Sequence, residues 1–186
     1  RLVGSEMCIR DSSYIMAKEK QLILLKNKLA NLPTGESRFD LCSILYSEYR
    51  NYQFDSVYAY ANKMYDIAIE NNNQSELVLA HVALLDCYTS VGFFKEAAEV
   101  DKLIKVTAIP KAVLPTYYTL KARMFQNLES YVGRESKLGL RYAHSRETCY
   151  DSILSLTPVG NYEHDYAAIE KLSLIHISEP TRRSYI

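Results

Sequence analysis

The chain has 186 residues, 48% of them apolar, and its 22 lysines and arginines balance its 22 aspartates and glutamates. This composition is ordinary for a globular chain with a real core, and its charge balance argues against a nucleic-acid-binding surface. Only 6 glycines and 5 prolines are present, which argues against a turn-rich β protein, and no stretch is long and apolar enough to span a membrane.

The two ends of the chain have the pattern of foreign sequence. Leu2–Ser12 and Leu172–Arg182 can be back-translated onto opposite strands of one DNA sequence, which resembles the transposase adapter used in library preparation. Such a coincidence is not expected in a natural gene. We therefore expect residues 1–12 and 172–186 to be non-native, and the native part to run from about Ser13 to Lys171.

Apolar residues recur at helical spacing along the chain and are separated by short breaks. A first helix, marked by leucines three or four residues apart, is expected to end at Pro33-Thr34-Gly35. Three helix pairs are then predicted, at 38–54 with 55–71, 74–91 with 94–107, and 115–131 with 141–156. Gly133–Gly139 is interpreted as a loose connection, and Tyr162–Lys171 as the first half of one more helix.

The helix pairs also repeat in sequence. Aligning Tyr49, Tyr88 and Phe125 in the first helix of each pair gives spacings of 39 and 37 residues. We expect a helical-repeat region at 13–158, with repeats at about 33–71, 72–109 and 110–158, and a truncated further repeat at 159–171. The 16 tyrosines are interpreted as filling the seams between helices, with a stacking or carbohydrate-binding surface as the alternative.

The second pair carries the most specific pattern, which joins Tyr88, Gly92, Phe94 and Ala97. A tyrosine in the first helix, a glycine at the turn, an aromatic opening the second helix and a small residue at the seam together resemble the tetratricopeptide core. The resemblance implies an all-α fold of antiparallel helical hairpins stacked into a short right-handed solenoid. Tyr88, Phe94 and Ala97 are then expected to lie close together and to be mostly buried.

A narrower resemblance covers most of the chain between its two ends. The segments Leu45–Tyr49, Phe54–Ala61, Gly92–Ala97 and Tyr150–Ser152 are similar to the repeat region of a family of bacterial transcriptional regulators. Members of that family typically carry an exported tetratricopeptide domain followed by a membrane helix, a coiled coil and a DNA-binding domain. This resemblance implies a location on the periplasmic side of the inner membrane; without it, a cytoplasmic location is expected.

No residue pattern favours catalysis or a bound metal. The sequence contains no HExxH, P-loop, GxSxG or GxGxxG motif. His81 is interpreted as a hydrogen-bonded residue of a helix seam. Cys42, Cys87 and Cys149 have no paired spacing and are interpreted as small buried apolar residues. We therefore expect no enzyme activity, no catalytic or metal-binding residues and no cofactor.

What the pattern does predict is a binding surface. The first helices of stacked hairpins line the concave side of a solenoid, and the groove-facing positions lie two before, one after and two after the aligned aromatic residues. These positions hold Ser47, Arg50, Asn51, Asp86, Thr89, Ser90, Arg123, Gln126 and Asn127. Arg50 and Arg123 are expected to anchor a protein or peptide segment, with Asp86 oriented between them or receiving a basic group.

Two functions therefore remain open. The first is a non-catalytic sensory or scaffold domain of a membrane-anchored bacterial regulator, acting in signal transduction, of which this chain is a fragment. The second is a free-standing cytoplasmic tetratricopeptide scaffold or co-chaperone. In both, the partner is a protein or peptide segment or another domain of the same full-length chain, and the groove residues could also be merely solvated.

Overall fold

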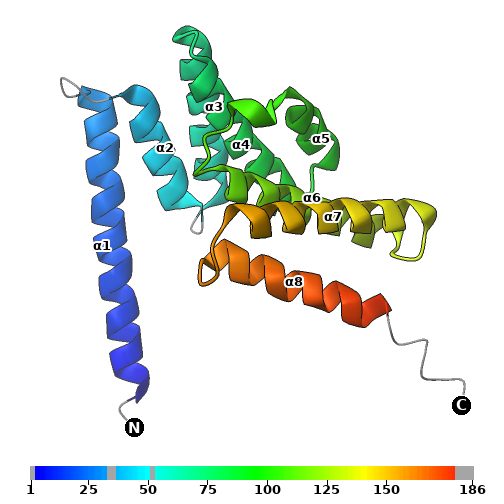
Figure 1. The fold of residues 1–186 in the computed structure, drawn as a ribbon. Helices are drawn as coiled ribbons and strands as arrows, with labels where there is room; N and C mark the ends of the chain where they lie inside the picture. Colours follow the sequence, from blue (N-terminus) through cyan, green and yellow to red (C-terminus); the bar gives the residue numbers. More distant parts are fainter. Residues whose placement is uncertain (1–2, 33–36, 51–52, 179–186) are drawn as a thin grey trace, which may run out of the picture. The chain divides into compact units, whose positions relative to one another are not determined.

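A computed structural model of the chain describes residues 3–32, 37–50 and 53–178, with side chains described at 15–32, 37–50 and 53–173. Every regular element in these ranges is helical (Figure 1). The elements are α1 (Val3–Asn31), α2 (Arg38–Tyr49), α3 (Phe54–Glu70), α4 (Gln74–Val91), α5 (Phe94–Leu103), the 3-10 turn η1 (Val106–Ala108), α6 (Leu114–Val132), α7 (Lys137–Leu156) and α8 (Tyr162–Ser178). The prediction of an all-α helical-repeat fold is confirmed.

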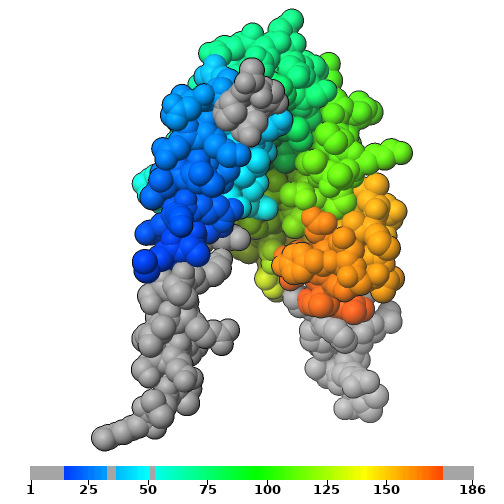
Figure 2. All heavy atoms as spheres, turned by 90° about the vertical axis from the view of Figure 1, so that its left-hand side faces the viewer, coloured from blue at the N-terminus to red at the C-terminus, as the bar shows by residue number. Residues whose placement is uncertain are grey.

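The chain forms two compact units, Arg1–Ala83 and Leu84–Ile186, and the boundary between them falls inside α4. In the first unit α1 packs on α2 and α2 packs on α3. The space-filling view shows the side chains of α1 (blue) against those of α2 (cyan) (Figure 2). Leu45, Ala61 and Met64 lie at the centre of this unit and are almost completely buried. Their burial is the main source of its stability.

Aromatic rings and lysines join the three helices of the first unit. Tyr49 of α2 and Tyr60 of α3 stack with their ring centroids 5.7 Å apart. The ammonium of Lys26, from α1, lies 5.3 Å from the Tyr49 centroid, and that of Lys63 lies 5.0 Å from the Tyr60 centroid. A cation over a ring face is attracted by the ring quadrupole, so this stack links α1 to the α2–α3 hairpin.

In the second unit α6 packs closely on α7, and α7 packs on α8. Tyr117, Tyr150 and Ile153 are fully buried between these helices. The Tyr117 hydroxyl donates a hydrogen bond to Asp101 Oδ1 at 2.8 Å, and Lys121 Nζ lies 3.0 Å from Asp101 Oδ2. Because Asp101 belongs to α5, these two interactions join α5 to α6.

The turn between α4 and α5 has the geometry that the sequence predicts. Gly92 has a φ of +81°, a left-handed conformation that glycine adopts without the steric cost of a side chain. The Phe93 amide donates to the Tyr88 carbonyl at 2.9 Å and closes the turn. Ala97 is completely buried, as predicted, whereas Tyr88 and Phe94 are half-buried.

Helix boundaries differ from the predicted ones mainly around the loops. The predicted helices 38–54 and 94–107 end early, at Tyr49 and Leu103. The predicted helix 141–156 begins earlier, at Lys137, because the Ser136 hydroxyl accepts a hydrogen bond from the Gly139 amide and caps it.

The connection before α7 is therefore compact rather than loose. A methyl group on Gly139 would lie only 2.2 Å from the Gly133 carbonyl oxygen, so the loop backbone packs directly against the first turn of the helix. The Ser136 hydroxyl also donates to the Gly133 carbonyl at 2.8 Å. Glycine at position 139 is thus required by the close approach of two backbone segments.

The helical backbone extends into both ends of the chain. α1 begins at Val3 and α8 ends at Ser178, so both helices include residues that we expect to be foreign. The expected foreign origin of these residues remains a prediction from the sequence. No helix within the described ranges combines the length and the apolarity that a membrane span needs.

Candidate functional site

The predicted groove residues of the first unit lie at the C-terminal end of α2. Ser47 is exposed, and its hydroxyl donates to the Ser43 carbonyl one turn earlier at 3.0 Å. Arg50 is exposed and follows the last residue of the helix. Asn51 lies outside the described residues. Of these positions, Arg50 offers the fixed fork of donors that a partner carboxylate or carbonyl would need.

In the second unit the structure brings three predicted residues together. Arg123 of α6 places Nη2 2.5 Å from Asp86 Oδ1 of α4, and the same nitrogen donates to the Ser90 hydroxyl at 3.2 Å. The Ser90 hydroxyl in turn donates to the Asp86 carbonyl at 2.8 Å. These bonds link α4 to α6 through side chains that lie 37 residues apart in the chain.

Burial differs between the two charges of this pair. The Asp86 side chain is only 4% exposed, whereas that of Arg123 is 41% exposed. A buried carboxylate without a counter-charge would be costly, so Asp86 holds the Arg123 guanidinium in place. The partly exposed Arg123 side chain thus has its direction already fixed, which reduces the conformational entropy that binding a partner would cost.

The remaining predicted residues of this unit are less accessible. Thr89 is 1% exposed, so its side chain does not face an open groove as the sequence analysis expected. The reason is that α4 is an interior helix, buried at nearly every position from Val78 to Asp86. Helical periodicity identifies the exposed face of a helix only when one face is exposed, and this part of α4 has no such face. Gln126 and Asn127, on α6, are half-buried.

A second ion pair, which the sequence analysis missed, lies between α6 and α7. Arg146 Nη2 is 2.7 Å from Glu129 Oε2, and the two side chains are only 4% and 6% exposed. Arg134 Nε lies 3.6 Å from the other Glu129 oxygen. Burial raises the pKa of the neighbouring Tyr150 hydroxyl, and the charge of Arg146 opposes that rise. Removing one charge of such a buried pair costs about 3–5 kcal/mol, so the pair fixes α7 on α6.

The sequence provides no signal for this pair. Arg146 lies in the same helix as the exposed residues Arg141 and His144, and nothing in the sequence separates it from them. Glu129 lies 17 positions earlier in the chain, near the end of α6. Only the packing of the two helices shows that one arginine of the group turns inward.

The histidines are placed by the packing of the helices. His81 is 7% exposed, its ring lies 5.6 Å from the ring of Tyr65, and burial lowers its pKa. It therefore occupies a seam, as predicted, although its Nδ1 has no hydrogen-bond partner among the described residues. His164 Nδ1 lies 2.8 Å from the Thr157 carbonyl, which requires the proton on that nitrogen.

The described residues include no group of three His, Cys, Asp or Glu side chains arranged to hold a metal ion. The two units contain paired α-helices, and polar side chains lie at the end of the first helix of a pair. This arrangement is that of a tetratricopeptide-type repeat domain, a class of protein-interaction domain.

Comparison with known proteins identifies the family. The profile of the SusR N-terminal TPR domain matches residues 9–177, where TPR denotes the tetratricopeptide repeat. The chain belongs to this family. This match confirms the expected resemblance to the N-terminal repeat region of a bacterial regulator. No curated protein and no solved structure gives a significant match to the chain.

Proposed function

We propose that the chain is the sensory, protein-binding domain of a membrane-anchored bacterial regulator, and that it acts without catalysis or a cofactor. Family membership supports this proposal, because the family is defined by a domain at the N-terminus of a longer protein. The domain lies on the periplasmic side of the inner membrane in this proposal, and contact with nucleic acid is left to other parts of the full-length protein.

The observation that carries the binding role is the orientation of Arg123. Its guanidinium is held by the buried carboxylate of Asp86 and by Ser90, yet the side chain is 41% exposed. Arginine donates in a planar fork that fits carbonyl and carboxylate oxygens. A peptide or protein segment bound here would accept from Arg123 in the second unit, and Arg50 would serve as an anchor in the first unit.

The test uses the complete gene, recovered from the source DNA, in a cell that reports transcription of the regulated gene. Arg123→Lys keeps a positive charge for Asp86 but removes the fork, and it is combined with Arg50→Ala. Lys95→Ala, an exposed change on α5, is the matched control. We expect the double variant to lower the transcriptional response about tenfold or more, since a hydrogen bond to a charged group contributes about 1.5–3 kcal/mol. The control should be unchanged.

A full response from the double variant, in protein that melts at the control temperature, would show that this surface binds no partner. The surface would then serve only to pack against another domain of the same chain. The complete reading frame tests the membrane-anchored part of the proposal separately. A frame without a signal peptide upstream and a membrane helix downstream would favour a cytoplasmic scaffold or co-chaperone instead.

A further inference from the structure

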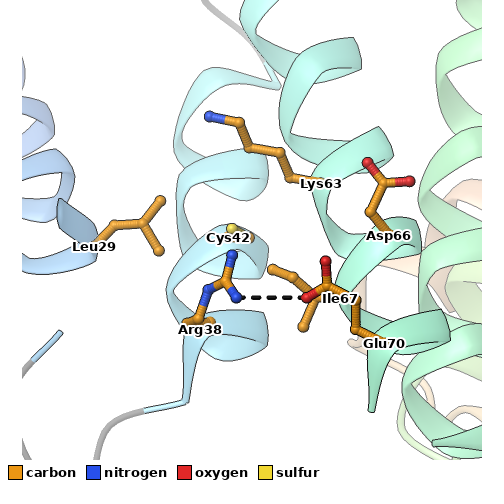
Figure 3. A pocket seen from close by; sticks show the side chains of 7 residues that line it. All are labelled: Leu29, Arg38, Cys42, Lys63, Asp66, Ile67 and Glu70. Carbon is orange, nitrogen blue, oxygen red and sulfur yellow. Dashed lines mark hydrogen bonds and ion pairs between the residues drawn. The ribbon is translucent and has the colours of Figure 1, made fainter. Parts of the chain in front are cut away.

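The first unit contains a cleft between α1, α2 and α3 that lies apart from the predicted groove positions. Its volume is about 290 Å³, close to the lower limit of small-molecule sites. The cleft is lined by Leu29, Arg38, Cys42, Lys63, Asp66, Ile67 and Glu70 (Figure 3). A cleft of this size accommodates a small metabolite rather than a folded partner.

Two cations line the cleft from different helices. Figure 3 shows the Arg38 guanidinium, on α2, beside the thiol of Cys42 at the base of the cleft. Lys63, on α3, and Arg38 line the same cleft as Cys42, and both charges counteract the rise that burial causes in the pKa of that thiol. Together they form a positive end of the cleft.

Each cation has a neighbouring side chain that it contacts. Arg38 Nη1 donates to Glu70 Oε2 at 3.5 Å, and the Lys63 ammonium lies 5.0 Å from the centroid of the Tyr60 ring. The ring contact uses the face of the π system and leaves the ammonium N–H groups able to donate to a ligand. A carboxylate could therefore be received between Arg38 and Lys63.

The cleft also carries negative charge and apolar surface. Asp66 and Glu70 lie one turn apart on α3, and Figure 3 shows both carboxylates beside the cleft. Leu29 from α1 and Ile67 from α3 supply apolar lining. A simple anion would meet two carboxylates here, and a simple cation would meet two positive groups. A ligand that carries a positive group, a negative group and an apolar group is complementary to all three kinds of side chain that line the cleft.

We propose that this cleft binds a free α-amino acid with an apolar side chain. Its carboxylate is received by Arg38 and Lys63, its ammonium by Asp66, and its side chain by Leu29 and Ile67. This site is independent of the concave-face function proposed above. It gives the domain a small-molecule input in addition to a protein partner.

The test is calorimetric titration of the full chain with three probes: leucine, N-acetylleucine, which lacks the ammonium, and leucinamide, which lacks the carboxylate. We expect leucine to bind, and the other two to bind at least about tenfold more weakly, because each leaves a charged group of the cleft without its partner. Lys63→Met should reduce the preference for leucine over leucinamide, because only Arg38 is then left to receive the carboxylate. Asp66→Asn should remove the preference for leucine over N-acetylleucine.

Lys95→Met, an exposed change in the second unit, is the control and should bind leucine as the unchanged chain does. Lys63 and Asp66 are both exposed, so the variants should fold, and circular dichroism checks that they do. The absence of leucine binding up to about 10 mM, a generous limit for so small a ligand, would overturn the proposal. Equal binding of all three probes, or binding that survives both substitutions, would also overturn it.

Discussion

Replacing Gly139 by alanine reverses the usual effect of that substitution in a helix. An alanine normally stabilises a helix by about 0.5–1 kcal/mol relative to glycine. Here the new methyl group would lie 2.2 Å from the Gly133 carbonyl oxygen and 3.0 Å from the Arg134 carbonyl oxygen. Both obstacles are backbone atoms, and Ser136 ties the same loop to the helix through hydrogen bonds at 2.8 and 2.9 Å. The loop must therefore shift as a whole.

Overpacking of this kind costs about 1–3 kcal/mol. For a chain of this length each kcal/mol lowers the melting temperature by about 2–4 °C, so Gly139→Ala should melt roughly 2–12 °C below the unchanged chain. Circular dichroism during thermal and urea unfolding measures the change. Ser130→Ala, at an exposed position of α6, is the control and should be neutral or slightly stabilising. A Gly139→Ala chain as stable as the control would refute the close approach of loop and helix.

Two further changes test the packing. Ala97→Leu adds bulk at a completely buried position and should cost about 1–3 kcal/mol, seen as a lower urea midpoint, whereas the neighbouring exposed change Glu96→Leu should not. Burial lowers the pKa of His81 below its ordinary 6.5. The unfolded chain then takes up the proton first, so the free energy of unfolding should fall as the pH is lowered through 6.5. That slope should be smaller in His81→Gln, and an identical slope would show that other groups cause it.

The local features of the fold could be predicted from the sequence because they depend on neighbouring residues. The turn at Gly92 requires a left-handed backbone, and glycine meets that requirement without help from distant residues. The seam position of Ala97 was implied by the resemblance of residues 88–97 to the tetratricopeptide core. The early start of α7 was missed because Gly133 and Gly139 were interpreted as flexible, whereas one of them permits a close contact and Ser136 caps the helix.

The candidate site was harder to predict because it depends on how helices distant in sequence meet. The sequence placed Asp86 and Arg123 on one binding surface, and the structure pairs them with each other. It gave no indication that Thr89 would be buried or that Arg146 would turn inward to Glu129. A polar side chain on a helix can face solvent, contact a partner or form a buried ion pair. Only tertiary packing selects among these.

The pairing of Arg123 also limits what the surface around this residue could bind. Its bonds to Asp86 and to Ser90 both use the nitrogen Nη2, and Nε is buried, so Nη1 is the nitrogen left for a partner. A partner carboxylate would bring a second negative charge close to a buried one and would compete with Asp86 for the same cation. A backbone carbonyl adds a hydrogen bond without that repulsion. The geometry of Arg123 therefore favours the main chain of an extended peptide over an acidic side chain.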